Sequence, residues 1–367
     1  MPVPLLLEKS HVIASYGDAL VALDDFRTEM LNTLVREPAP AGQAMAFRSA
    51  AGEMAGTALR NVHATGVGVR GSNDFVIKVY VFEQADVQAA ASVALLSRAR
   101  DGVDVDVEYL PVQMAFGTAP ARAARRPGAP KATANPAQHR KRRRPVPGGV
   151  EIGPLGGNFV GTLGCFVRGG SGEDGPLSLL SNNHVLADVN RFPIGTKFTQ
   201  PFSSNSTDVI AALTAFEPIL FPTVNSQPRN VMDAAIAVVA DTSQVALKTM
   251  LNIANYNPLL MAARPGMAVI KSGRTTGVTT GSIRAIRVRG VQVNYGTRQN
   301  PIIATFDNAI TITATGAGPF SNPGDSGSVI LDKQSGRPVA LLFAGDATTT
   351  TACDMTAVCT RFGVHPV

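Results

Sequence analysis

The sequence contains no tryptophan and only three cysteines among 367 residues. So small and odd a number of thiols cannot build the paired disulfides that many secreted proteins of this size carry, so we expect a cytoplasmic protein. The amino-terminal segment agrees, because its three leucines are followed at once by Glu8 and Lys9, too early for the apolar core of a signal peptide. Cys165 is interpreted as a buried strand residue.

Long apolar runs and ligand clusters are missing as well. No stretch is long enough to span a bilayer, so the sequence predicts no membrane span. The five histidines are scattered, no two cysteines stand at ligand spacing with a histidine, and no glycine-rich phosphate loop joins a strand to a helix. We therefore expect no metal and no cofactor.

The excess of basic charge is confined to one stretch. The formal net charge is +6, but residues 122–144 hold nine of the 33 basic residues and no acidic one, which leaves 24 basic against 27 acidic residues elsewhere. A slightly acidic remainder has no electrostatic footprint for a phosphate backbone. A nucleic-acid partner is therefore not expected, and any such contact would depend on the basic stretch alone.

The rest of the composition is typical of a folded, turn-rich protein. Hydrophobic residues make up 45% of the chain and charged residues 16%, which is a globular balance. With 35 glycines, 25 prolines and β-branched residues crowding the second half, the sequence favours an all-β domain there. The length leaves room for two domains.

Residues 1–116 are expected to form a small α+β module. Apolar spacing predicts helices over 20–36 and 87–100 and strands over 64–70, 75–82 and 103–110. Residues 117–149 lose this periodicity and are rich in Ala, Pro, Gly, Arg and Lys, which predicts a linker. Its basic run, residues 139–144, has three interpretations: a cleavage site, a tether to an anionic surface, or a solvated spacer.

Residues 150–367 are expected to form a mainly β domain. Short strands separated by turns, without long helices between them, favour antiparallel barrels over a βαβ sheet. The predicted strands cover residues 159–167, 177–180, 209–216, 234–239, 268–270, 281–288, 302–306, 309–313, 328–331 and 339–343.

The strongest chemical signal is Asn322-Pro-Gly-Asp-Ser326-Gly-Ser328, just before a predicted strand. Glycines on both sides of the serine permit a turn that exposes its side chain, and the N–H groups of Gly324 and Ser326 then point into one small space. Two convergent amides are what a developing oxyanion needs. A plain Gly-Asp-Ser-Gly β-turn is the alternative.

A serine nucleophile needs a base, and the sequence offers one well-placed histidine. His11, His139 and His365 lie in the amino-terminal segment, the linker and the carboxyl terminus, and His63 lies in the front module. His184 instead follows a predicted strand in the segment Leu-Leu-Ser-Asn-Asn-His-Val-Leu. A lone histidine there would more often be structural, but the serine motif downstream favours a general base.

A triad also needs a carboxylate that orients the imidazole. Asp233 leads into the apolar run Ala-Ala-Ile-Ala-Val-Val, so its carboxylate enters a core, where it must have a partner. Asp208 and Asp241 also border strands, but each is interpreted as a turn or surface residue. We therefore take Asp233 as the third member.

In their order and contexts, these three residues resemble the catalytic residues of the chymotrypsin-like, trypsin-fold serine proteases. The segment Lys271-Ser-Gly-Arg-Thr-Thr-Gly277 is similar to one in the bacterial α-lytic and streptogrisin branch, and residues 155–367 as a whole resemble intracellular trypsin-like proteins of bacteria and plants. The resemblance implies a double antiparallel β-barrel, with His184 and Asp233 from the first barrel and Ser326 from the second. It also implies hydrolysis of a protein or peptide substrate through an acyl-enzyme.

The resemblance also assigns a substrate pocket. Phe320, six residues before the serine, would lie at its base, and the strand Phe343-Ala344-Gly345 would form one wall and could pair with an extended substrate. Asp346 and Asp354 lie nearby in sequence, so a preference for basic residues stays open.

The sequence departs from the family in two places. The disulfide beside the catalytic histidine cannot form, since Val, Leu and Ala follow His184, and Ser328 stands where many members have glycine. Neither departure removes a chemical role, and both fit a reducing compartment.

Because all three side chains are present in order, a serine endopeptidase is the favoured function. The alternative is a catalytically silent trypsin-fold protein that binds peptides or acts as a scaffold. A compact front module on a basic tether further predicts regulation, in which residues 1–116 hold the protease latent or recruit a regulatory protein partner.

Overall fold

The computed structural model describes residues 15–36, 61–71, 74–91, 103–115, 136–170 and 172–367. The chain divides into two compact units, Met1–Tyr109 and Leu110–Val367. This boundary after Tyr109 comes slightly before the one expected after residue 116.

The first unit is an α+β module in its described part. Its elements are α1 (Tyr16–Arg36), β1 (Val62–Arg70), β2 (Asp74–Val81), α3 (Asp86–Ala91) and β3 (Val105–Tyr109). β1 and β2 form an antiparallel hairpin, and β3 adds to β2 in parallel. Arg27 of α1 ties the helix to the sheet by donating to the Thr65 hydroxyl of β1 at 2.9 Å. Residues 92–100 of the helix expected over 87–100 lie outside the described residues.

The second unit contains a closed barrel. Its strands are β15 (Ala268–Gly273), β16 (Gly277–Arg289), β19 (Ala309–Ala314), β20 (Val329–Asp332), β21 (Pro338–Gly345) and β22 (Thr349–Asp354). Among the described residues these six close a ring of antiparallel pairs, β15 to β16 to β19 to β22 to β21 to β20 and back to β15. This ring carries the serine motif in the loop before β20.

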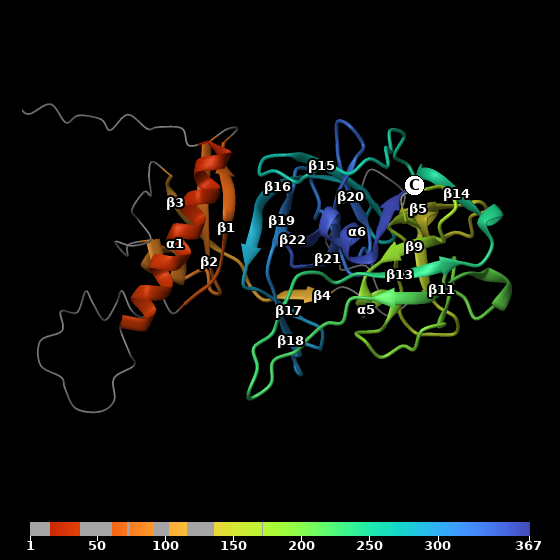
Figure 1. Ribbon diagram of the computed structural model, residues 1–367, viewed down its shortest axis with the longest axis horizontal. Coiled ribbons are helices and arrows are strands. Elements are labelled where there is room, and N and C mark those ends of the chain that lie inside the picture. The colour runs from red at the N-terminus through yellow and green to blue at the C-terminus, as the bar shows by residue number, and fades with distance from the viewer. Residues whose placement is uncertain (1–14, 37–60, 72–73, 92–102, 116–135, 171) are drawn as a thin grey trace, which may run out of the picture. The chain divides into compact units, whose positions relative to one another are not determined.

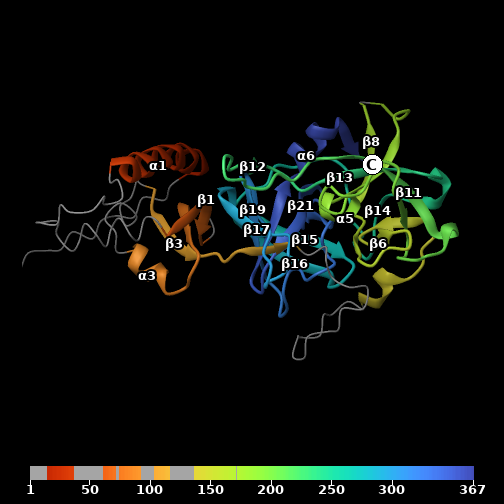
Figure 2. The ribbon, with the colours of Figure 1, turned by 90° about the horizontal axis from the view of Figure 1, so that it is seen from below.

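A second sheet of the same unit curls into a half-barrel. In spatial order its strands are β23 (Val364–Pro366), β8 (Cys165–Gly169), β9 (Leu177–Ser181), β13 (Ala235–Val239), β11 (Val209–Phe216), β10 (Lys197–Thr199), β6 (Glu151–Pro154) and β7 (Gly161–Thr162). Its core is built from buried side chains such as Phe166, Leu179, Phe198 and Leu213. Figure 2 shows this half-barrel on one side of the unit, with β8, β11 and β6, and the closed barrel with β15, β16 and β21 beside it.

Shorter elements complete the second unit. They are β4 (Gln113–Ala115), η2 (Pro136–Arg140), β5 (Val146–Gly148), α5 (Asn183–Leu186), η3 (Ser206–Asp208), β12 (Arg229–Asn230), η4 (Thr242–Gln244), β14 (Val245–Met250), β17 (Val291–Asn294), β18 (Ile303–Phe306) and α6 (Met355–Phe362). The architecture is mainly β with two antiparallel barrels, so the predicted fold class is confirmed. The strand expected over 159–167 is in fact two, β7 and β8, because Leu163 and Gly164 interrupt it.

Part of the expected basic linker is folded. His139 in η2 is buried and its Nδ1 lies 2.8 Å from the carbonyl oxygen of Gly149, while Arg144 donates to the side-chain oxygen of Gln244 at 2.9 Å. β5 then pairs with β14. Residues 136–149 therefore differ from a solvated spacer, one of the three interpretations of the basic run, because Arg144 donates to the neutral Gln244 oxygen and Arg142 to the Asp208 carboxylate of the barrel domain. Residues 117–135 lie outside the described residues.

Within the part of the chain that the structure describes, no helix is long and apolar enough to cross a membrane.

Candidate active site

Strand pairing brings His184 and Asp233 together. β9 ends at Ser181, three residues before His184, and β13 begins at Ala235, two residues after Asp233. Since Ser181 pairs with Ala235 in an antiparallel ladder, the segment that leaves one strand lies beside the segment that enters the other. The local sequence thus delivers both side chains to the same end of the half-barrel.

The two side chains form a short hydrogen bond. Nδ1 of His184 lies 2.5 Å from Oδ2 of Asp233, and the main-chain N–H of His184 donates to Oδ1 at 3.2 Å. Because a carboxylate only accepts hydrogen bonds, Nδ1 carries the proton and Nε2 is left as a base. Nε2 is buried and has no hydrogen-bond partner among the described residues.

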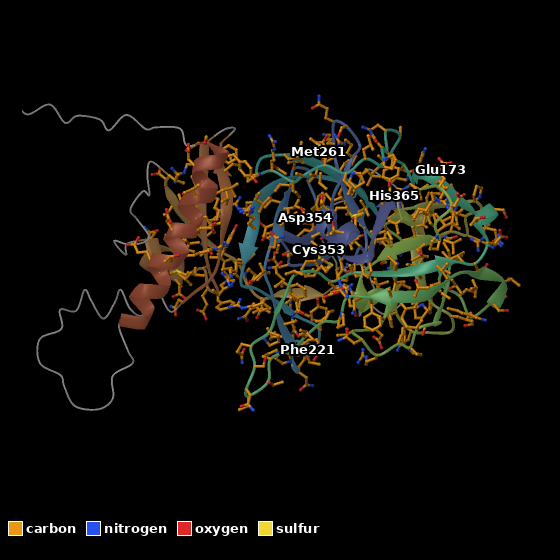
Figure 3. The ribbon with its side chains drawn as sticks, in the orientation of Figure 1. Glu173, Phe221, Met261, Cys353, Asp354 and His365 are labelled. Atoms are coloured by element: carbon orange, nitrogen blue, oxygen red, sulfur yellow. The ribbon has the colours of Figure 1, made fainter. Side chains whose placement is uncertain are left out.

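Asp233 is fully buried, and three further groups hold it. The Tyr295 hydroxyl donates to Oδ2 at 2.8 Å, and the Asp233 N–H donates to the Cys353 sulfur at 3.2 Å. The side chain of Asn182 donates to the Asp233 carbonyl oxygen at 2.6 Å. Cys353, labelled in Figure 3, lies in β22, so strands of both barrels fix this aspartate.

Burial keeps two of these partners protonated. It raises the pKa of the Tyr295 hydroxyl well above its ordinary value, and the negative charge of Asp233 raises it further. Burial likewise raises the pKa of the Cys353 thiol. Tyr295 is therefore a hydrogen-bond donor to Asp233 at every pH at which the protein would be assayed.

The serine motif forms a tight loop whose glycines are required. Gly324 and Gly327 have φ of +98° and +89°, a region that other residues rarely adopt. A side chain at Gly327 would also overlap the Ser181 hydroxyl. The N–H groups of Gly324 and Ser326 donate no hydrogen bond within the described residues. Neither amide therefore has an acceptor within the described part of the chain.

Asp325, next to the serine, anchors this loop inside the closed barrel. Its buried carboxylate accepts from the N–H of Thr275 at 2.7 Å and from the hydroxyl of Thr276 at 2.7 Å. The Lys271 ammonium lies 3.5 Å from it, and both side chains are fully buried. Burial lowers the pKa of Lys271, and Asp325 opposes that shift. The segment 271–277 singled out in the sequence thus supports the loop that carries Ser326.

Thr162 docks the loop on the half-barrel. Its N–H donates to the Ser326 carbonyl oxygen at 2.8 Å, and its hydroxyl donates to the Gly324 carbonyl oxygen at 2.9 Å. The Thr162 carbonyl in turn accepts from the Ser181 hydroxyl at 2.8 Å. Ser326 is therefore linked through a single residue to the end of β9, three residues before His184.

The Ser326 hydroxyl itself is turned toward the main chain. It donates to the Phe343 carbonyl oxygen at 3.4 Å, and no hydrogen bond joins it to His184 within the described residues. Of the competing acids, Asp208 binds Arg142 at 2.9 Å and Asp241 caps η4, so neither accepts from His184.

The residues expected to line a substrate pocket, Phe320 and residues 343–345, have different surroundings in the structure. Phe320 is buried, its carbonyl accepts from the Thr279 hydroxyl at 2.7 Å, and its ring lies 5.9 Å from the Lys271 ammonium. Phe343 packs its ring on Phe306 at 4.8 Å. Ala344 and Gly345 continue β21 beyond the carbonyl that Ser326 contacts.

Sequence reasoning missed two residues of this site. Tyr295 lies 62 residues from Asp233 in a short polar hairpin, where a single tyrosine carries no pattern. Thr162 was assigned to a strand without a role. Only the folded chain shows that they hold the proposed base and nucleophile in place. No group of three or more metal-binding side chains occurs in the part of the chain that the structure describes.

Comparison with known proteins gives a likeness at the level of fold. No protein-family model and no curated protein matches the sequence. Among solved structures, Thermobifida fusca protease A is 18% identical and covers 60% of this chain and 98% of its own, with a TM-score of 0.42. Cellulomonas bogoriensis chymotrypsin is 19% identical, with the same coverage and a TM-score of 0.41. Nocardiopsis protease is 18% identical, again with the same coverage and a TM-score of 0.41.

Similarity at this level says nothing about activity or substrate. The chain's own geometry is that of a double antiparallel β-barrel, with a bonded histidine and aspartate at one end of the half-barrel and a serine loop of the closed barrel docked on that half-barrel.

Proposed function

We propose that this protein is a serine endopeptidase, with Ser326 as the nucleophile, His184 as the general base and Asp233 as the carboxylate that orients it. The observation that carries the proposal is the bond between His184 and Asp233 at 2.5 Å, which leaves Nε2 of His184 buried and unpartnered. A buried ring nitrogen without a partner costs stability, and a role as general base gives a reason for keeping it.

The proposed reaction proceeds in two halves. Ser326 Oγ attacks the carbonyl carbon of the scissile peptide bond while its proton passes to Nε2 of His184. The negative charge on the carbonyl oxygen is held by the N–H groups of Gly324 and Ser326. His184 then protonates the leaving amine, which gives an acyl-enzyme. A water molecule that His184 deprotonates releases the acid and restores the serine.

The substrate would be a protein or peptide, bound with its chain extended along β21. In this proposal Phe320 lies at the base of the pocket, and Phe343, Ala344 and Gly345 form its wall. The β21 residues that extend past the Ser326 contact are consistent with a wall of this kind.

Labelling with a small alkyl fluorophosphonate tests the proposal. The wild type should be modified on Ser326, Ser326→Ala should not react, and His184→Ala should react at least about 1,000-fold more slowly. Ser328→Ala is the matched control, because the Ser328 hydroxyl only donates to the Asp325 carbonyl in the same loop. A folded wild type that does not label would favour the silent peptide-binding alternative, as would labelling that is indifferent to His184.

A further inference from the structure

The carboxyl-terminal end of β21 is paired with another segment of the same chain. β4 runs antiparallel to β21, with Ala115 opposite Ala344 and Met114 opposite Gly345. On its other side β4 pairs in parallel with β17, where Gln113 lies opposite Val293. Figure 1 shows β4 beside both strands. The three residues of β4 thus fill a slot between two strands.

The direction of β4 matches that of the acyl part of a substrate. The Phe343 carbonyl that accepts from Ser326 directly precedes Ala344 in β21. Because the pairing is antiparallel, β4 advances toward that carbonyl as it runs from Gln113 to Ala115. A substrate whose acyl part pairs antiparallel with β21, up to the Phe343 carbonyl beside Ser326, runs the same way along the same edge.

One buried side chain fixes β4 in the slot. Gln113 is fully buried, and its amide nitrogen donates to the Asp346 carboxylate at 2.7 Å. Its amide oxygen accepts from the Thr351 hydroxyl at 3.4 Å. By contrast, the strand itself is only three residues long, so few main-chain hydrogen bonds hold it. β4 is therefore fixed in register by one side chain and held by few main-chain hydrogen bonds.

We propose that β4 is an internal occupant of the substrate-binding slot, and that peptides bind in extended form by replacing it. The proposal rests on the proposed endopeptidase function. It assigns the latency expected of the amino-terminal residues to a defined element, because an occupied β21 edge cannot pair with a substrate. It also predicts the substrate class: extended peptides with a small residue opposite Ala344, since Ala115 is only 7% exposed there.

A disulfide across the directly opposed pair tests whether β4 must leave. Opposed residues of an antiparallel pair have Cα atoms about 4.5–5.5 Å apart, which suits a disulfide. In the full-length Ala115→Cys, Ala344→Cys double variant, the oxidised protein has β4 locked on β21, and the same sample after reduction is the control. The native Cys165, Cys353 and Cys359 are free and buried and do not compete.

Two probes separate this inference from the proposed function. The first is a small alkyl fluorophosphonate, which needs Ser326 but not the slot. The second is a Gln-Met-Ala-Phe diphenyl phosphonate, whose peptide copies residues 113–116 and needs the slot. Oxidation should slow the peptidyl probe at least about 100-fold relative to the reduced sample of the same variant. The small probe is measured on both samples to show that Ser326 still reacts in each. Equal peptidyl labelling in both redox states, with the small probe active, would overturn the inference. A reduced protein that the small probe does not label would instead overturn the proposed function.

Loosening β4 should have the opposite effect. Met114→Pro removes a main-chain donor from a strand that is paired on both sides, and Met114→Leu is the matched control. Peptidyl labelling of the proline variant should be at least about tenfold faster than that of the wild type, with the leucine variant unchanged. Unchanged or slower peptidyl labelling in a proline variant that still reacts with the small probe would count against β4 as an occupant. Should the proline variant fail to fold, the disulfide measurement decides alone.

Discussion

Tyr295→Phe removes one hydroxyl from the buried partner of Asp233. That hydroxyl donates to Oδ2 at 2.8 Å, the same oxygen that lies 2.5 Å from Nδ1 of His184. The ring would stay where it is, because it packs edge to face on Phe221 at 5.8 Å and tilted on Phe306 at 6.2 Å. The substitution therefore changes the carboxylate's hydrogen bonding and little else.

The size of the effect follows from the charge of the acceptor. Hydrogen bonds to a charged group contribute about 1.5–3 kcal/mol, and a buried carboxylate cannot replace the lost donor with water at no cost. Burial keeps the pKa of Tyr295 high, so the wild-type bond is present at every assay pH. In the proposed mechanism Asp233 must hold an imidazolium in place in the transition state. The loss would then slow acylation of Ser326 by about 10- to 100-fold.

The assay is the second-order rate constant for fluorophosphonate labelling, measured well below the unfolding temperature of each variant. Tyr256→Phe is the matched control, because it removes the hydroxyl of another tyrosine, one that lies beside Cys165 and outside the site. The control should label at the wild-type rate within about twofold. Urea unfolding of both variants separates a loss of stability from a loss of reactivity.

A Tyr295→Phe protein that labels at the wild-type rate would refute this reasoning. It would show that the two contacts from His184 hold the Asp233 carboxylate well enough without the Tyr295 hydroxyl. A protein that loses stability but keeps its labelling rate would assign Tyr295 to the core rather than to the positioning of Asp233.

Two further predictions concern groups around the serine loop and the basic segment. Lys271→Met leaves the buried Asp325 carboxylate without its counter-charge 3.5 Å away, so urea unfolding should show a loss of about 3–5 kcal/mol, part of which Asp325→Asn in the same chain should restore. Burial lowers the pKa of His139, so below about pH 6.5 the His139 side chain binds a proton more readily in the unfolded chain than in the folded one. The free energy of unfolding should therefore fall between pH 7 and pH 5, and His139→Gln should flatten that slope in urea titrations at each pH.

Sequence patterns were sufficient for the barrels and for the neighbourhood of His184 and Asp233. The short β-rich run over residues 209–216 predicts a strand with the bounds that β11 has in the structure. The aspartate before β13 was recognised from the apolar run that follows it. A carboxylate that enters a core needs a partner, and the partner lies at the end of the adjacent strand.

Contacts between segments that lie far apart in the sequence and have no regular pattern were not predicted. Residues 136–149 were interpreted as part of a linker because composition shows their charge but not the oxygens that receive it, such as those of the Gln244 side chain and the Asp208 carboxylate. The strand Gln113–Ala115 is too short for any periodicity. Its position is set by β17 and β21, which lie about 180 and 230 residues further along the chain. The same holds for Tyr295, whose role depends on a hairpin that sequence cannot place.

The β17 residue that pairs with β4 and the residue that donates to Asp233 are neighbours in the sequence. Asn294 of β17 pairs with Met114 of β4, and the next residue, Tyr295, bonds the carboxylate that orients His184. Whatever fills the slot between β17 and β21 therefore supports the strand that ends at this donor. On the proposals made above, a peptide long enough to replace β4 restores that support, whereas a shorter one leaves β17 unpaired on this side. The rate of acylation should then rise with the length of the peptide as well as with its fit to the pocket, because the residues that pair with β17 also hold Tyr295 against Asp233.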